Sequence, residues 1–314
     1  MDLCEWLGLG EAGRTLGAVR ARLQRRVVRE AFPEGVRVAA WLVLAGAEEA
    51  DADGYRRLLG QGPASSAAKI ARDAPRTFRG ATDFGARVEP GAITRVLNAA
   101  MHDLGAHYVQ GMNALCGVLV YVGGELLGFA LFRRLCRLLP TYFGEGAREG
   151  DGLVGCAAGC ALVERVLEAA DCELLHHLRR HGMAGPLLGY GTLLSLGAAL
   201  EPLREVVVLW DFLLAFTPAV MPLVVSARLI LARPLLLRSQ NPLGVSQGLP
   251  LDARACIAKA LELYAGLSPD AVDLVARHVC DPDACRRLLG AKERGEGEES
   301  ENLDFTASSA SAEA

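Results

Sequence analysis

Two polar side chains, Arg76 and Gln110, lie in short polar stretches of an otherwise apolar sequence. Arg76 belongs to the stretch 70–78, and Gln110 belongs to the stretch 108–113. A guanidinium group can neutralise the negative charge that develops on phosphoryl oxygens, and a carboxamide can both accept a hydrogen bond from an attacking water and donate one to it. Hydrolysis of a phosphoryl group can use both groups together, and neither could supply the chemistry alone.

The residues around Arg76 predict a helix that ends just before it. Pro75 disfavours helical geometry at the preceding residue, Ala74, so a helix that begins at Ile70 should end there. Arg76 would then leave the helix on a constrained turn. A rigid turn is a suitable support for a side chain that must reach into another molecule.

Gln110 is predicted to lie at the mouth of a buried helix. Residues 114–122 are nearly all apolar, and in a helix this pattern indicates burial on all sides. Gly111 follows Gln110 and gives the backbone the freedom to approach another surface closely.

Apolar residues recur at steps of three and four along most of the chain, and this spacing predicts helices. The predicted helices cover residues 16–31, 36–45, a short segment within 51–68, 93–104, 114–122, 126–139, 153–170, 172–181, 252–265 and 269–280. Pro234, Pro242 and Pro250 indicate loops. No alternation of apolar and polar residues is long enough for a strand, so the sequence predicts an all-α fold without a sheet.

The stretch 206–227 is almost entirely apolar, so a membrane span has to be considered. Asp211 would be costly in lipid, and Pro218 and Pro222 divide the stretch into pieces too short to cross a bilayer. Two buried helices joined by a turn are the better interpretation, and no membrane span is predicted.

The composition indicates a large globular protein. The 314 residues are 51% hydrophobic, enough to bury a sizeable core in one large domain or two. The N-terminus has no basic region followed by an apolar run, so no signal peptide is predicted. The nine cysteines are therefore expected in a reducing, cytoplasmic setting.

Negative charge is concentrated at the C-terminus. Residues 291–314 carry seven acidic residues against Lys292 and Arg294, a net charge of −5, whereas the whole chain carries −4. The body is therefore close to neutral, at +1, which argues against a nucleic-acid partner. The acidic segment has few apolar residues and is predicted to be disordered.

The order I-x-x-D-x-x-R-T, followed about 30 residues later by Y-x-Q-G-M-N, resembles the two-finger signature of TBC-domain GTPase-activating proteins. The resemblance implies that Arg76 and Gln110, the finger residues, act in trans on a small Rab- or Ras-like GTPase that carries the GTP and the Mg²⁺. The protein would then activate its partner's hydrolysis, would not be a hydrolase itself and would need no cofactor of its own. Supporting roles fall to the other polar residues of the motif, Asp73, Thr77, Tyr108 and Asn113.

A nucleotide or metal site of the chain's own is not predicted. The sequence contains no G-x-x-x-x-G-K-[ST] motif. His176, His177 and His181 with Cys172 could place ligands one turn apart, but no H-E-x-x-H and no second ligand pair at zinc spacing accompany them.

Two further motifs extend the resemblance. Arg37 and Trp41 stand one turn apart and resemble the first TBC motif, which packs the N-terminal helices. Trp210 and Asp211 resemble the late W-D motif, which buries the tryptophan and lets the aspartate support the site. Together the matches cover most of residues 16–285 and imply a domain of two helical lobes.

The predicted boundaries are an N-terminal lead segment over residues 1–15, the TBC domain over 16–290 and the acidic tail over 291–314. Three positions depart from the family pattern: Arg79 where a proline is common, Val208 where a basic residue is usual, and Thr217 where many members have glycine. These departures concern the support of the site and leave both finger residues intact.

Three stretches, residues 140–142, 207–216 and 273–282, look most like the mitotic-exit checkpoint branch of the family. That likeness implies spindle checkpoint control, a scaffold protein as the second component of the activator, and a location at the spindle pole. The alternatives are a vesicle-traffic Rab activator, a catalytically silent TBC scaffold, and an α-solenoid interaction protein. Intact finger residues argue against the silent scaffold. A solenoid predicts an internal repeat of roughly 30 to 45 residues, and the sequence has none.

Overall fold

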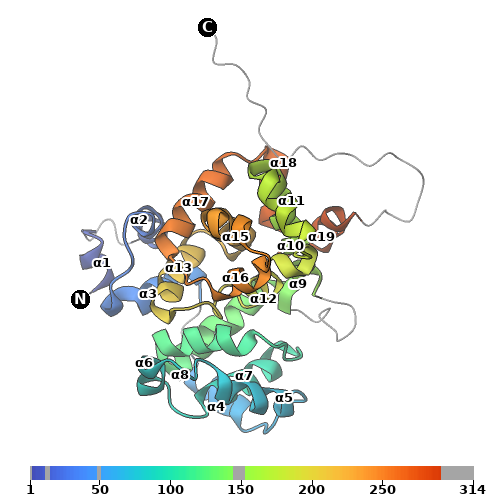
Figure 1. Ribbon diagram of the computed structural model, residues 1–314. Helices are drawn as coiled ribbons and strands as arrows, with labels where there is room; N and C mark the ends of the chain where they lie inside the picture. The colour runs from blue at the N-terminus through green and yellow to red at the C-terminus, as the bar shows by residue number, and fades with distance from the viewer. Residues whose placement is uncertain (1, 11–14, 48–50, 144–152, 291–314) are drawn as a thin grey trace.

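The apolar steps of three and four residues fold as helices throughout a computed structural model of the chain, which describes residues 2–10, 15–47, 51–143 and 153–290 (Figure 1). No β-strand occurs in these ranges, and the prediction of an all-α fold is confirmed. The acidic tail predicted over 291–314 lies outside the described residues.

The N-terminal helices pack on one side of the molecule (Figure 1). They are α1 (Leu3–Trp6), α2 (Leu16–Val27) and α3 (Glu34–Ala45). The Trp6 ring meets the Phe32 ring edge-on at 5.8 Å, and the Arg26 guanidinium lies 4.4 Å from the centre of the Trp6 ring. Leu7 is fully buried. The described part of the lead segment is therefore packed against the body.

The helices that carry the two finger residues form the lower part of the molecule in Figure 1. They are α4 (Ala52–Leu59), α5 (Ala67–Asp73), a 3₁₀ turn (Ala74–Arg76), α6 (Thr82–Arg87), α7 (Ala92–Leu104) and α8 (Met112–Leu138). α7 packs along α8. At Gly124, α8 bends, because φ is 71° and ψ is −177° there. The helices predicted over 114–122 and 126–139 are the two arms of this bent helix.

The rest of the chain forms the upper part of Figure 1. It comprises α9 (Pro140–Phe143), α10 (Val154–Ala170), α11 (Cys172–Arg180), a 3₁₀ turn (Gly185–Leu188), α12 (Tyr190–Leu194), α13 (Leu203–Ala215), a 3₁₀ turn (Pro218–Val220), α14 (Met221–Leu231), α15 (Arg233–Arg238), α16 (Pro242–Gly248), α17 (Ala253–Ala265), α18 (Pro269–Arg277) and α19 (Pro282–Leu289).

Proline positions explain where the predicted helices and the structure differ. Pro234 and Pro242 lie in the first turns of α15 and α16, whereas the sequence pattern predicts loops at both positions. Proline fits a first helical turn because its fixed φ suits the helix and its missing N–H has no partner there in any case. Pro282 begins α19 in the same way, one helix beyond the last one predicted.

The apolar stretch 206–227 forms two buried helices, as predicted. The chain bends by 119° between α13 and the segment 218–231, so the two do not form one continuous span. Among the described residues α8 is long and apolar enough to cross a membrane, and the bent pair would count as a second such segment. However, 61% of the most apolar window of α8 is buried inside the protein, as expected for a core helix.

A buried carboxylate joins α3 to α13. Asp211 has no exposed surface, and its Oδ1 accepts hydrogen bonds from Trp41 Nε1 at 2.7 Å and Arg37 Nε at 3.0 Å. Its Oδ2 accepts from the Phe32 N–H at 2.9 Å. Burial raises the pKa of the Asp211 carboxyl, while Arg37 and the other donors oppose that rise. The two stretches that resemble the first and the late family motifs, Arg37 with Trp41 and Trp210 with Asp211, are thus joined to each other by the hydrogen bonds of Asp211.

A second joint brings together two of the stretches that suggested the checkpoint branch. Thr141 Oγ1 donates to the His278 carbonyl at 2.7 Å, and His278 Nε2 lies 3.1 Å from the Tyr142 hydroxyl. His278 Nδ1 lies 2.8 Å from the Val275 carbonyl, so Nδ1 carries the proton and Nε2 accepts from Tyr142. His278 is completely buried, and burial lowers its pKa from 6.5 to about 4.

This histidine should make the fold sensitive to mild acid. In the unfolded chain His278 binds a proton near pH 6.5, but in the folded protein only near pH 4, so its contribution is complete above pH 6.5 and is lost as the pH falls toward 4. The free energy of unfolding should drop by about 2 kcal/mol from this group between pH 7 and pH 5. Urea unfolding at both pH values measures the drop.

The matched variant for this measurement is His278→Gln, which keeps a polar side chain without a titrating group. It should unfold more easily at pH 7 but lose less stability than the wild type on going to pH 5. Equal losses for the two proteins would mean that carboxylates, and not His278, set the acid sensitivity.

Candidate functional site

Arg76 stands on a short turn at the end of α5, as the sequence predicted, although the α-helix ends at Asp73 and a 3₁₀ turn carries the chain on to Arg76. The Arg76 side chain is 66% exposed. Its Nε donates to the Arg72 carbonyl at 2.9 Å, and its Nη2 pairs with Asp73 Oδ1 at 2.5 Å. The guanidinium is therefore oriented by its own turn and faces solvent.

The turn rests directly on α8 because residue 117 is a glycine. A Cβ atom at Gly117 would lie 2.9 Å from both the Thr77 and the Phe78 side chains. Phe78 adopts a φ of 52°, unusual for a residue other than glycine, and its ring packs 4.9 Å from that of Phe84. Gly117 therefore positions the arginine turn, a role that its place within an apolar run did not reveal.

Gln110 is exposed in the loop that leads into α8. The next residue, Gly111, has a φ of 108°, which side chains rarely allow, and a Cβ there would lie 3.2 Å from Leu194 Cγ. Ahead of Gln110, the Tyr108 N–H donates to Ser66 Oγ at 3.1 Å. The glutamine is thus held between the start of α5 and the α12 segment, in a loop that requires glycine.

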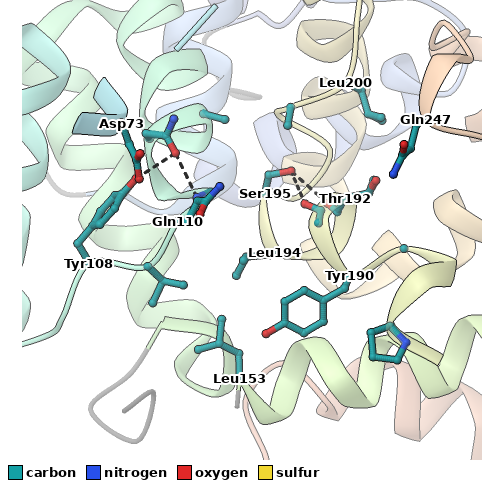
Figure 2. Close-up of a pocket in the computed structure, with 18 of the residues that line it drawn as sticks. Asp73, Tyr108, Gln110, Leu153, Tyr190, Thr192, Leu194, Ser195, Leu200 and Gln247 are labelled. Carbon is teal, nitrogen blue, oxygen red and sulfur yellow. Dashed lines mark hydrogen bonds between the residues drawn. The ribbon is translucent and has the colours of Figure 1, made fainter. Parts of the chain in front are cut away.

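A closed set of hydrogen bonds ties the arginine turn to the glutamine loop, and Figure 2 shows two of the residues that take part, Asp73 and Tyr108, side by side. The Tyr108 hydroxyl lies 2.9 Å from Asp73 Oδ2 and 3.1 Å from Asn113 Oδ1. Asn113 Nδ2 donates to Thr77 Oγ1 at 2.9 Å, and Thr77 Oγ1 donates to the Asp73 carbonyl at 3.2 Å. Asn113 Oδ1 also accepts from the Gly111 N–H at 3.1 Å. We call Asp73, Thr77, Tyr108 and Asn113 the support ring.

The electrostatics of the support ring favour one arrangement of its protons. Burial raises the pKa of the Tyr108 hydroxyl far above its ordinary value, and the hydrogen bond to Asp73 raises it further. Tyr108 is therefore a neutral donor, and Asp73 accepts from it with one oxygen and from Arg76 with the other. Asp73 thus contacts both loops at once.

Both finger residues line a cleft of about 2200 Å³ between the two helical lobes. Its opposite wall is the α12 segment and α16, with Tyr190, Thr192, Ser195 and Gln247 drawn in Figure 2. Among the described residues that line the cleft, four are Lys or Arg and one is acidic: Lys69, Arg72, Arg76 and Arg228 against Asp73. This balance suits a partner surface that carries phosphate groups.

Trp210 supports the far wall of the cleft. Its indole N–H donates to the Leu196 carbonyl at 3.1 Å, which fixes the segment next to Leu194, the residue that faces Gly111. Asp211 does not contact the arginine turn or the glutamine loop, since its hydrogen bonds go to Phe32, Arg37 and Trp41. Any support that Asp211 gives to the site is therefore indirect, through the helices behind the wall.

The histidines of α11 do not form part of this cleft. His177 and His181 have ring centres 4.3 Å apart, and His181 Nδ1 lies 2.9 Å from the His177 carbonyl. Within the described ranges, no group of three or more His, Cys, Asp or Glu side chains could hold a metal ion.

Comparisons with known proteins agree with this architecture. The family model RabGAP-TBC, the Rab-GTPase-TBC domain, matches residues 34–237, which include both finger residues. Cell division control protein 16 of Schizosaccharomyces pombe is 32% identical over 247 residues, which are 78% of this chain and 81% of that protein. Mitotic check point protein BUB2 of Saccharomyces cerevisiae is 29% identical over 266 residues, with 79% of this chain and 85% of that protein covered.

Among solved structures, the Ypt/Rab-GAP domain of Gyp1p superposes with a TM-score of 0.69 at 14% sequence identity, covering 84% of this chain and 99% of that one. At this identity the likeness concerns the fold, which is that of two helical lobes around a cleft. The family model spans more than half of the chain, from α3 to α15. The chain belongs to the RabGAP-TBC family.

Proposed function

We propose that this protein accelerates GTP hydrolysis on a small Rab- or Ras-like GTPase by placing Arg76 and Gln110 beside the γ-phosphate. One observation carries the proposal: an exposed arginine and an exposed glutamine stand on separate loops that the support ring ties together at one cleft. A pair of side chains held in this way can enter a partner's nucleotide site together.

The two side chains would divide the work. The Arg76 guanidinium would neutralise charge on the phosphoryl oxygens in the transition state, and the Gln110 carboxamide would orient the attacking water. The Arg76 side chain is 66% exposed although its partner Asp73 is only 17% exposed, so the guanidinium lies on the solvent side of the pair, where a phosphate can reach it. GTP and Mg²⁺ would be brought by the partner, and this chain would act as an activator and not as a hydrolase.

The test is single-turnover hydrolysis by a panel of small GTPases loaded with GTP and Mg²⁺, with and without this protein. At least one member should hydrolyse its GTP faster. A member that binds tightly without any acceleration, while no other is accelerated, would instead support a catalytically silent TBC scaffold.

The relatives named for cell division and the mitotic check point support a role in the same process. We propose that the protein acts in checkpoint control at the spindle pole, from the cytoplasm, together with a scaffold protein. The joint between Thr141, Tyr142 and His278 links two of the stretches that suggested this branch. Repeating the panel with candidate scaffold proteins tests this choice, since acceleration of a traffic Rab without any scaffold would favour a role in vesicle traffic.

Tyr108→Phe should slow the accelerated hydrolysis by about ten- to hundredfold while leaving the fold intact. The change keeps the ring and removes only the hydroxyl that contacts Asp73 and Asn113. A hydrogen bond to a charged group is worth about 1.5 to 3 kcal/mol, and 1.4 kcal/mol is a factor of ten in rate. Single-turnover rates at saturating activator measure the effect. Unchanged rates would mean that the support ring is dispensable.

A further inference from the structure

A groove separate from the finger cleft runs beside α2. It encloses about 960 Å³ and is lined by residues near the C-terminal end of α2 and by Phe216, which follows α13. The groove shares no lining residue with the cleft that holds Arg76 and Gln110. A peptide segment bound in the groove would therefore contact residues other than those that line the cleft.

The groove presents apolar side chains to solvent. Val28 is 44% exposed and Phe216 is 42% exposed, although both are large apolar residues. Phe216 is held in place, because its ring centre lies 4.8 Å from that of the buried Phe212, and Gln24 Nε2 donates to the carbonyl of the neighbouring Ala215 at 2.8 Å. The groove thus offers a fixed apolar contact for one side chain of a ligand.

Arginines surround this apolar contact. Arg22, Arg25, Arg26 and Arg29 line the groove. Glu30 is the one acidic residue among the described residues of the lining, and it is paired with Arg26 at 2.8 Å. In the described part of the chain, Arg25 and Arg29 are exposed and have no ion-pair partner. The groove therefore carries positive charge that no described carboxylate compensates.

The arginines of the groove are not needed to cap α2. Arg254, on α17, donates from Nη1 to the Val27 carbonyl at 2.7 Å, and the backbone N–H groups of Arg29 and Glu30 both bond the Arg26 carbonyl. With these helix-end carbonyls satisfied, the side chains of Arg25 and Arg29 are free to meet a ligand. Guanidinium groups match carboxylates with two parallel hydrogen bonds.

We propose that this groove docks an acidic peptide segment of a partner protein, with one aromatic or large aliphatic side chain set against Phe216 and Val28 and with flanking carboxylates paired to Arg25 and Arg29. The charge of the groove selects an acidic ligand, and its exposed apolar pair selects a ligand with an apolar anchor. A concave groove accommodates a chain segment, whereas a bilayer presents a flat surface. Partner and GTPase would then bind to separate places on the same activator.

The test measures, by fluorescence anisotropy, the binding of a labelled 12-residue peptide to the full chain. The peptide consists of glutamate and aspartate with one central phenylalanine. The wild type should bind it saturably, and less tightly when serine replaces the phenylalanine. Arg25→Glu combined with Arg29→Glu should weaken binding at least tenfold, and Phe216→Ser should weaken it severalfold. The matched control is Arg180→Glu with Arg204→Glu, two exposed arginines outside the groove, which should bind as the wild type does.

Melting temperatures of all variants show whether the fold is retained, and raised salt should weaken wild-type binding because the charges are exposed. Binding by the Arg25→Glu, Arg29→Glu variant within twofold of the wild type would overturn the proposal. Two other results would also overturn it. In the first, the protein binds vesicles that contain phosphatidylserine through the same residues but does not bind the peptide. In the second, the peptide binds only to a protein truncated after Gly290, which would mean that the chain's own acidic residues 291–314 occupy the groove.

Discussion

Arg76→Ala is expected to reduce the accelerated rate of GTP hydrolysis by roughly 10³ to 10⁵, or about 4 to 7 kcal/mol of barrier, without changing the melting temperature. The loss is expected because the role proposed for Arg76 is to neutralise charge on the transferring phosphoryl group. The fold should survive because the Arg76 side chain is 66% exposed and Asp73 keeps its hydrogen bond from the Tyr108 hydroxyl. Single-turnover hydrolysis at saturating activator measures the loss.

Two further variants are compared with Arg76→Ala in the same assay. Arg76→Lys should fail almost as badly, because an ammonium is a point charge and cannot contact two oxygens as the guanidinium fork does. Arg79→Ala removes an exposed arginine three residues away that does not line the cleft, and it should leave the rate unchanged. If Arg76→Ala kept more than a tenth of the wild-type acceleration, the assignment of the arginine would be wrong.

Gln110→Ala should reduce the acceleration by roughly 10² or more, about 2.7 kcal/mol of barrier. Ras-like GTPases use a glutamine of their own to position the attacking water, so an activator that supplies another makes the partner's residue partly dispensable. The wild-type protein should therefore still accelerate hydrolysis by a GTPase whose own glutamine has been replaced by leucine. Single-turnover hydrolysis by that substituted GTPase is the measurement.

The control is Gln240→Ala, which removes a glutamine outside the cleft and should have no effect on the rate. Complete loss of acceleration on the substituted GTPase, with binding preserved, would show that Gln110 only positions the partner. Arg76 alone would then account for the activity.

Local sequence determined the parts of the structure that depend on short-range geometry. The helical periods, the end of α5 ahead of Pro75 and the freedom needed at Gly111 all follow from residues within a few positions of one another. The contacts between distant segments could not be derived in this way. Gly117 leaves space for Thr77 and Phe78, and nothing within the apolar run around it indicates what it faces.

The two family motifs around Asp211 show the same limit. A carboxylate that follows a buried tryptophan can point to either side of its helix, and spacing alone cannot say which segment it contacts. The structure directs Asp211 to Phe32, Arg37 and Trp41, some 170 residues earlier in the chain. Proline has a similar ambiguity, since Pro234 and Pro242 suit a loop and a first helical turn equally well by sequence.

The support ring has a consequence for the thermodynamics of association. Both loops are ordered by internal hydrogen bonds before any GTPase arrives, so binding need not freeze their backbones. What remains to be immobilised is mainly the Arg76 and Gln110 side chains, at about 0.5 to 1.5 kcal/mol each. A calorimetric titration with a GTPase should accordingly show a smaller entropic penalty for the wild type than for Asn113→Ala, in which the arginine turn and the glutamine loop would have to find each other during the encounter.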